Sequence, residues 1–220
     1  MRRQVIAEWL DEDLGTAADI AASLADLRRI NAWFGGTRAT VNLLRRIALA
    51  SDARELSLLE VGAGAGDVPL AAKTALAQEG VDVRVVLLDR RLAHLPGGMT
   101  AIGGDALHLP FRDDAFDVVS SSLFAHHLDP EKLRLFAHEA LRVCRCAMII
   151  NDLIRSRMHL ALVCMGLPLF RSRLTWHDAP ASVRQAYTVE EMCQFLSPLQ
   201  ARQMEITRHY LYRMGVLIWK

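Results

Sequence analysis

The chain has 220 residues, of which 52% are hydrophobic and 23% charged, and its formal net charge is +1. This length fits one α/β domain with a sizeable core. A net charge so close to zero implies no polyanion-binding surface. No stretch approaches the roughly 18 to 20 apolar residues of a membrane-spanning helix, so we expect no integral membrane association.

The four cysteines are few and irregularly spaced, at Cys144, Cys146, Cys164 and Cys193. The first two share one face of an expected strand, but no second pair completes a zinc site. We therefore expect reduced, buried thiols and no metal, which suits the cytoplasm. The start of the chain also carries charges where a signal peptide needs an apolar core.

Residues 1 to about 50 are expected to be helical, because apolar side chains recur at helical spacing up to Phe34. Thr16 or Asp19 is a candidate N-cap of this first helix. The two glycines after Phe34 predict a break, and a second helix is expected over 37–50.

Further along, runs rich in Val, Ile and Leu alternate with helical patterns. The expected strands are 56–61, 81–88, 99–103, 116–120 and 147–151, and the expected helices are 68–79, 90–95 and 130–145. This alternation predicts a doubly wound, Rossmann-like α/β sheet. The runs 203–210 and 214–219 predict a C-terminal antiparallel β-hairpin, which a plain dinucleotide-binding fold lacks.

The first expected strand leads directly into Gly62, Gly64 and Gly66 and then into a helix. Glycines allow positive φ and a close approach of the backbone to a ligand. The helix start offers free N–H groups and a positive dipole end. We therefore expect a nucleotide-like cofactor beside this loop. Its spacing is G-x-G-x-G, whereas a NAD-binding turn normally shows G-x-G-x-x-G.

This loop, with Glu60 two residues before its first glycine, resembles motif I of class I S-adenosylmethionine-dependent methyltransferases. Three further motifs fit that family: Asp89 ends the second strand, a Gly-Asp-Ala segment contains Asp105, and a Pro-Phe-x-Asp-x-x-Phe-Asp run starts at Pro110. The four motifs follow the family's order over 56–152. The chain is similar to small-molecule, type 11/12-like bacterial methyltransferases. The resemblance implies a seven-stranded sheet with an antiparallel final strand.

The resemblance also implies S-adenosylmethionine as cofactor and S-adenosylhomocysteine as product. Glu60 would lie near the methionine amino group, Asp89 would hold the ribose and Asp105 would read the adenine edge. A helix N-cap is the alternative role for Asp89. Ser121 or Ser122, just past the fourth strand, would lie near the reactive methyl. The implied cofactor-binding residues are Glu60, Gly62, Ala63, Gly64, Asp89, Arg90, Asp105, Ala106, Ser121 and Ser122.

Methyl transfer from a sulfonium requires positioning and a dry cavity, and an oxygen or acidic-carbon acceptor also benefits from a base. His126 or His127, which follow the fourth strand, are candidate bases, with a structural role as the alternative. His177 is another candidate catalytic residue, and its alternative is a loop histidine bonded to Asp178.

The acceptor is expected to bind outside the shared core, at the N-terminal helices and at the insert 153–187. The Met-rich apolar insert suits a pocket for a hydrophobic acceptor. A helix packed on the core and weak membrane-surface contact are the alternatives. The run 173–188 resembles bacterial methyltransferases of polyketide- or quinone-like acceptors. No basic patch and no Asn/Asp-Pro-Pro-Tyr/Phe pattern occurs, which argues against a nucleic-acid substrate.

We therefore expect one methyltransferase domain over 1–220. Its parts are a helical cap (1–50), a cofactor-binding core (51–152), an acceptor-side insert (153–187), and a final helix and hairpin (188–220). The leading hypothesis is methyl transfer to a small, hydrophobic or aromatic acceptor at oxygen or carbon, in secondary metabolism. The alternatives are an NAD(P)-dependent oxidoreductase and a non-catalytic binding module of the same fold. The sequence predicts no oligomeric state.

Overall fold

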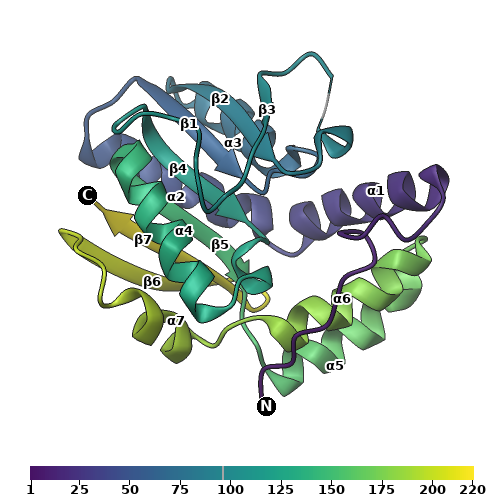
Figure 1. Ribbon diagram of the computed structural model, residues 1–220. Helices are drawn as coiled ribbons and strands as arrows, with labels where there is room; N and C mark the ends of the chain where they lie inside the picture. Colours follow the sequence, from purple (N-terminus) through teal and green to yellow (C-terminus); the bar gives the residue numbers. More distant parts are fainter. Residues whose placement is uncertain (96) are drawn as a thin grey trace.

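The computed structural model describes residues 1–95 and 97–220, and a single mixed sheet runs through it (Figure 1). The strands are β1 (Glu55–Val61), β2 (Asp82–Asp89), β3 (Ala101–Gly103), β4 (Phe116–Ser122), β5 (Cys144–Leu153), β6 (Gln203–His209) and β7 (Arg213–Trp219). Their order is β3-β2-β1-β4-β5-β7-β6. β1 to β5 pair in parallel, whereas β7 is antiparallel to both β5 and β6. The predicted Rossmann-like seven-stranded sheet with a C-terminal hairpin is confirmed.

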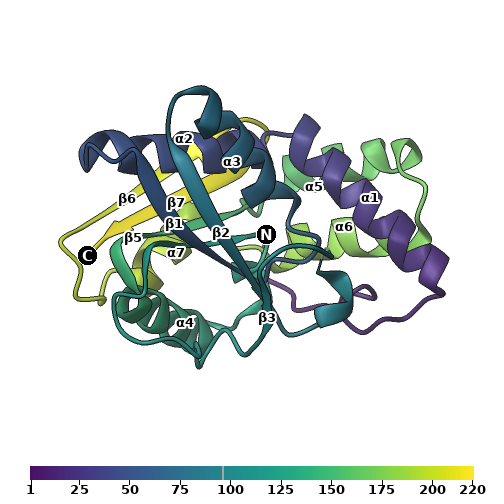
Figure 2. The ribbon, with the colours of Figure 1, turned by 90° about the horizontal axis from the view of Figure 1, so that it is seen from above.

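Helices cover both faces of this sheet, as Figure 2 shows from above. α2 (Gly36–Ala50) and α3 (Asp67–Gln78) pack on one face, and α4 (Pro130–Val143) and α7 (Val189–Leu196) pack on the other. Successive strand residues point to opposite faces. Leu58 therefore packs in the apolar core under α2 and α3, and Leu59 packs in the core under α4 and α7. Both faces of the central strands are therefore covered, which is why β5 carries a buried apolar run over 147–150. In the described ranges, no helix combines the length and the apolar character needed to span a membrane.

Three more helices form a separate group beside the sheet (Figure 1): α1 (Ala17–Trp33), α5 (Arg157–Gly166) and α6 (Arg173–Gln185). α1 starts with a capping box between Thr16 and Asp19, so both candidate caps take part. The fully buried carboxylate of Asp26 accepts hydrogen bonds from the backbone N–H groups of Arg171 and Ser172, each at 2.9 Å. α1 thus supplies the acceptor that the start of α6 needs, and the two helices are fixed to each other.

The prediction of a helix at the N-terminus was wrong for residues 1–16, which form an extended segment and hydrogen-bonded turns but no helix. This segment runs along α6 instead (Figure 1). The N–H of Gln4 donates to the carbonyl of Arg184 at 3.1 Å. The N–H groups of Trp9 and Leu10 donate to the Asp178 carboxylate at 2.8 and 3.0 Å. Because side chains and backbone of α6 satisfy these groups, the segment has no need of helical hydrogen bonds.

Several element ends differ from those expected. The helix expected over 90–95 is a single 3₁₀ turn, η1 (Leu92–His94), and the third strand shortens to β3. β4 continues to its pairing with Asn151, so Ser121 and Ser122 lie within the strand and not past it. The reason is pairing with β5, which extends beyond the apolar run that marked it in the sequence.

The cysteines are all free thiols, but the expectation that they are buried holds only for Cys144, because Cys146 on the same strand is partly exposed. Cys144 is buried on β5, whereas Cys164 and Cys193 are exposed on α5 and α7. Both helices turn these positions away from the packed side of the molecule.

Candidate active site

A cavity of about 990 Å³ lies at the carboxyl ends of β1, β2 and β4, between the sheet and the group of α1, α5 and α6. Ligands of open α/β sheets bind at this place. Nine of the ten predicted cofactor-binding residues line it, the exception being Ser121. Ser121 is buried within β4, and its hydroxyl has no hydrogen-bond partner among the described residues.

The glycine loop forms one wall of this cavity and is shaped by positive φ angles. Gly62 has φ +67°, and a Cβ there would lie 2.6 Å from the ring of Phe124. Gly64 has φ +50°, and a Cβ there would have no described atom within 4 Å. The loop is therefore packed against protein at Gly62 and open at Gly64, as a surface that cradles a ligand should be.

Asp89 at the end of β2 holds this loop in place. One carboxylate oxygen accepts from the N–H of Gly64 at 2.8 Å, and the other accepts from the N–H of Arg91 at 2.9 Å. The carboxylate thus fixes both the glycine loop and the turn after β2, and it lines the cavity as well.

Glu60 is a buried carboxyl group at the floor of the cavity, only 1% exposed. Burial raises the pKa of Glu60 to about 7, against the opposing effect of a hydrogen bond from the Ser120 hydroxyl. The nearby Ser122 hydroxyl also lines the cavity and has no hydrogen-bond partner in the described chain. A partly protonated carboxyl and an unpartnered hydroxyl side by side fit a cationic, hydrogen-bonding ligand such as an ammonium group.

Asp105 lies at the rim of the cavity, where its side chain is 61% exposed. The N–H of Leu107 donates to it at 2.9 Å and holds the pKa of this carboxyl below its usual range. Arg90 and Ala106 line the same region. The rim is therefore polar and open, in contrast to the buried floor at Glu60.

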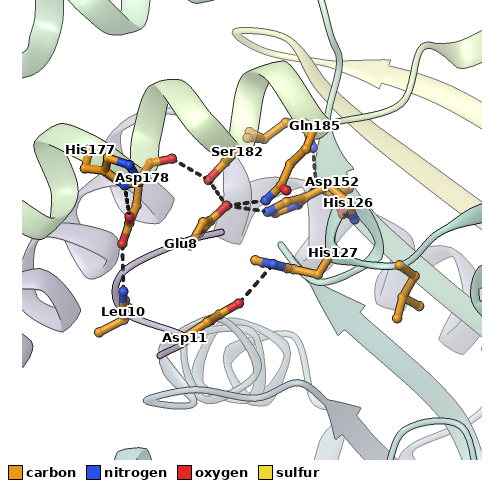
Figure 3. Close-up of polar contacts among 12 residues, drawn as sticks. Glu8, Leu10, Asp11, His126, His127, Asp152, His177, Asp178, Ser182 and Gln185 are labelled. Carbon is orange, nitrogen blue, oxygen red and sulfur yellow. Dashed lines mark hydrogen bonds and ion pairs between the residues drawn. The ribbon is translucent and has the colours of Figure 1, made fainter. Parts of the chain in front are cut away.

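His126 lies in the short helix η2 (Ala125–His127) after β4 and is clamped between two carboxylates (Figure 3). Its Nδ1 is 2.7 Å from an Asp152 oxygen, and its Nε2 is 3.4 Å from an oxygen of Glu8. Burial alone would lower the pKa of His126, but the charges of Asp152 and Glu8 raise that pKa to about 10. The ring therefore carries a proton at neutral pH.

Glu8 belongs to the N-terminal segment and ties it to both α6 and η2 (Figure 3). One of its oxygens accepts from the Ser182 hydroxyl and from the Gln185 amide, both at 2.6 Å. Burial alone would raise the pKa of Glu8, but the hydrogen bond and the charge of His126 hold that pKa below its usual range. The same segment places Asp11 3.0 Å from Nδ1 of His127, which lines the cavity.

Glu8, His126 and His127 could hold a metal, because each offers one nitrogen or oxygen atom within 4.8 Å of the others. A doubly protonated imidazole, however, has no lone pair for a metal. The arrangement therefore favours ion pairs, and the absence of a metal stays a prediction.

His177 sits on α6 and faces the N-terminal segment (Figure 3). Its Nδ1 is 2.7 Å from Asp178, as the alternative expected, but the residue lies in a helix and not in the expected loop. Its ring stacks on Trp9 with centroids 4.0 Å apart. Within the described ranges, it is not among the residues that line the cavity.

Two basic residues that sequence reasoning missed also line the cavity, His159 on α5 and Arg213 at the start of β7. Both are buried. No local motif marks either of them, and only the fold brings them together. For Asp152 a signal did exist, since a carboxylate follows the apolar run of the fifth strand.

The wall opposite the glycine loop is apolar. α1, α5 and the turn after α5 contribute it, through Leu24, Leu27, Ile30, Phe34, Leu162 and Phe170. The cavity therefore has a polar wall at the strand ends and an apolar wall from the helical group.

Residues 59–147 match a family model described as a methyltransferase domain. No curated protein matches the sequence. Among solved structures, the chain resembles the plantazolicin methyltransferase BpumL in complex with a pentazolic desmethylPZN analogue and SAH. The TM-score is 0.63 at 14% sequence identity, and the match covers 92% of this chain and 96% of that one.

Two other solved structures share the fold. A SAM-dependent methyltransferase from Aquifex aeolicus has a TM-score of 0.51 and 16% identity, over 74% of this chain and 81% of that one. An O-methyltransferase family 2 protein from Planctomyces limnophilus, in complex with apigenin, has a TM-score of 0.52 and 17% identity, over 75% of this chain and 50% of that one. Residues 59–147 thus match the methyltransferase domain family, and the chain as a whole shares the fold of S-adenosylmethionine-dependent methyltransferases.

Proposed function

We propose that the protein methylates a small, hydrophobic or aromatic acceptor, of polyketide- or quinone-like character, at oxygen or carbon. One observation carries this proposal: a single cavity joins the polar wall at the strand ends to the apolar wall of the helical group. A bound sulfonium cofactor supplies an electrophilic methyl with a good leaving group. The protein then has to align acceptor and methyl and to exclude water.

The cofactor is assigned to the polar wall, where the residues fit its groups. Glu60 and the unpartnered hydroxyl of Ser122 would receive the methionine ammonium. The open face at Gly64 leaves room for the methionine chain, and Asp89 lies where it can accept from ribose hydroxyls. Asp105 at the exposed rim is assigned to the adenine edge.

The acceptor is assigned to the apolar wall, which comes from the proposed cap (1–50) and insert (153–187). The bound pentazolic analogue and the bound apigenin in two similar structures support a small-molecule acceptor. The final part (188–220) completes the sheet and contributes the β6–β7 turn to the same cavity.

Among the three candidate histidines, His127 has the arrangement that best suits a general base. It lines the cavity, and the Asp11 carboxylate orients its Nδ1. His126 retains its proton at neutral pH, so we assign it to positioning of η2 and of the N-terminal segment. The stacking of His177 on Trp9 supports a structural role for it.

Isothermal titration with S-adenosylhomocysteine tests the cofactor assignment, with NADH as the comparison ligand. We expect binding of the first and none of the second. Well-folded protein that binds NADH instead would favour the oxidoreductase, and protein that binds neither would favour the non-catalytic module. Labelled S-adenosylmethionine with phenolic, quinol and fatty acceptors then tests the acceptor class.

A further inference from the structure

Arg213 is a buried cation, and one of its two terminal nitrogens has no hydrogen-bond partner in the described chain. The residue is 1% exposed, and its Nη2 donates to the Asn31 amide oxygen at 2.9 Å. Its Nη1 is buried and has no hydrogen-bond partner among the described residues. Burial lowers the pKa of Arg213 to about 10, with the charge of Asp152 opposing, so the side chain is charged at neutral pH.

The negative charge of Asp152 opposes the lowering of the Arg213 pKa, but both Asp152 oxygens accept hydrogen bonds from other residues. One accepts from the ring of His126 and from the N–H of Leu153, at 2.7 and 2.6 Å, and the other accepts from the backbone N–H of His126 at 3.0 Å. No carboxylate in the described chain forms an ion pair with Arg213. Buried arginines are normally paired, because an unpaired buried charge is costly. A ligand anion is the missing partner that the geometry suggests.

The turn between β6 and β7 brings two further residues to the cavity beside Arg213. Leu211 and Tyr212 both have positive φ, +49° and +60°, although neither is a glycine. Both residues line the cavity, as does Arg213 itself. Two consecutive positive φ angles are typical of a tight β-hairpin turn, and this turn holds Arg213 at the edge of the cavity.

His159 adds a neutral hydrogen-bond acceptor to the same region. Its ring stacks on Tyr212 with centroids 5.1 Å apart, and its Nδ1 donates to the carbonyl of Ile154 at 2.9 Å. Burial, reinforced by the charge of Arg213, lowers the pKa of His159 despite that hydrogen bond. The ring is therefore neutral, and the lone pair of Nε2 is left without a partner in the described chain.

We propose that Arg213 and His159 form a subsite for an acidic oxygen group, a carboxylate or an ionisable hydroxyl, that a ligand brings into the cavity. Arg213 would bind the anionic oxygen, and His159 would accept a hydrogen bond from a neighbouring hydroxyl. This inference rests on the proposed function and narrows the acceptor to acids, phenols and enols. The methionine carboxylate of the cofactor offers the same chemistry, so the test separates the two sources.

The test uses the full chain, the variants Arg213→Gln and Arg213→Lys, and the control Arg208→Gln. Arg208 carries the same charge on the neighbouring strand β6, where its side chain is 69% exposed. Benzoate and its neutral isostere benzamide are titrated into cofactor-free protein. S-adenosylhomocysteine and methylthioadenosine, which lacks the amino acid part, are titrated separately.

We expect the wild type to bind benzoate about tenfold more tightly than benzamide, the scale of one hydrogen bond to a charged group. Arg213→Gln should abolish this preference, whereas Arg213→Lys should retain much of it and Arg208→Gln all of it. If S-adenosylhomocysteine binding is unchanged in Arg213→Gln, the anion belongs to the acceptor. If that binding weakens while methylthioadenosine binding does not, the anion is the cofactor carboxylate.

The subsite is refuted if the wild type shows no preference for benzoate and Arg213→Gln binds S-adenosylhomocysteine as the wild type does. If Arg213→Gln does not fold, His159→Gln provides a second test. Salicylate carries a hydroxyl beside its carboxylate, so His159→Gln should weaken salicylate binding more than benzoate binding. Equal loss for both ligands would remove His159 from the subsite. Retained benzoate preference without any binding of S-adenosylhomocysteine would count against the proposed function alone.

Discussion

Glu60 should make cofactor binding depend on pH and release a proton. The pKa of Glu60 in the free protein is raised to about 7 by burial. An ammonium group beside it requires the ionised carboxylate, so binding competes with the proton. If only the ionised form binds, affinity at pH 6 is about tenfold lower than at pH 8, which corresponds to about 1.4 kcal/mol. About 0.9 proton is released on binding at pH 6 and about 0.1 at pH 8.

Isothermal titration of S-adenosylhomocysteine at pH 6, 7 and 8, in two buffers with different ionisation enthalpies, measures both quantities. Glu60→Gln should bind more weakly at pH 8 and should lose both the pH dependence and the proton release. The exposed Glu190→Gln on α7 is the matched control and should behave like the wild type. The same pH dependence in Glu60→Gln and the wild type would refute the assignment of the titrating group.

Glu60 should also lower the stability of the free protein at high pH. Its pKa in the folded state lies above the value of 4.5 for an unperturbed glutamate, so the unfolded state ionises first as pH rises. This penalty grows between pH 4.5 and pH 7 and reaches at most about 3 kcal/mol. Glu60→Gln should therefore raise the melting temperature at pH 8 while it weakens cofactor binding. A lower melting temperature would contradict this sign.

Further predictions concern the cavity and the ion pair between His126 and Asp152. Asp89→Ala should weaken S-adenosylhomocysteine binding by at least about 1 kcal/mol, and an unchanged dissociation constant in calorimetry would remove Asp89 from the site. Gly62→Ala should lower the melting temperature more than Gly64→Ala, because only the first places a Cβ 2.6 Å from a ring. Gly64→Ala should fold yet lose cofactor affinity, and the reverse order of the two melting temperatures would contradict the packing. Asp152→Asn should lower the free energy of unfolding by about 3–5 kcal/mol in urea at pH 7, because it removes a partner of the buried, charged His126. In the wild type, the contribution of His126, whose pKa is raised to about 10, is full below pH 6.5 and is lost as pH approaches 10, so a flat stability profile there would count against it.

The polar wall of the cavity could be predicted from the sequence because its residues lie in short, recognisable segments. The spacing from Glu60 through Gly64 predicts a strand, a turn and a helix, and the structure has all three. Asp89 was found by its place at the end of a strand, which β-sheet geometry makes adjacent to the glycine loop. The roles of these side chains toward a cofactor remain predictions.

The ion pairs of His126 and the place of Arg213 could not be predicted from the sequence, because their contacts join distant segments. Glu8 meets His126 only after the N-terminal segment has docked on α6, and nothing near Glu8 in the sequence signals this. The predicted N-terminal helix included residues 1–16 because the sequence does not show that this segment docks on α6. Arg213 follows two non-glycine residues with positive φ, a conformation that sequence patterns rarely reveal.

The two walls of the cavity come from non-overlapping stretches of the chain. The glycine loop and its carboxylates lie mostly within 59–147, whereas the apolar wall comes from α1 and α5 on either side of that range. Substitutions at Phe34 or Leu162 would reshape one wall without disturbing a hydrogen bond of the other. If the acceptor binds at the apolar wall as proposed, substitutions there would change acceptor preference and leave cofactor binding intact.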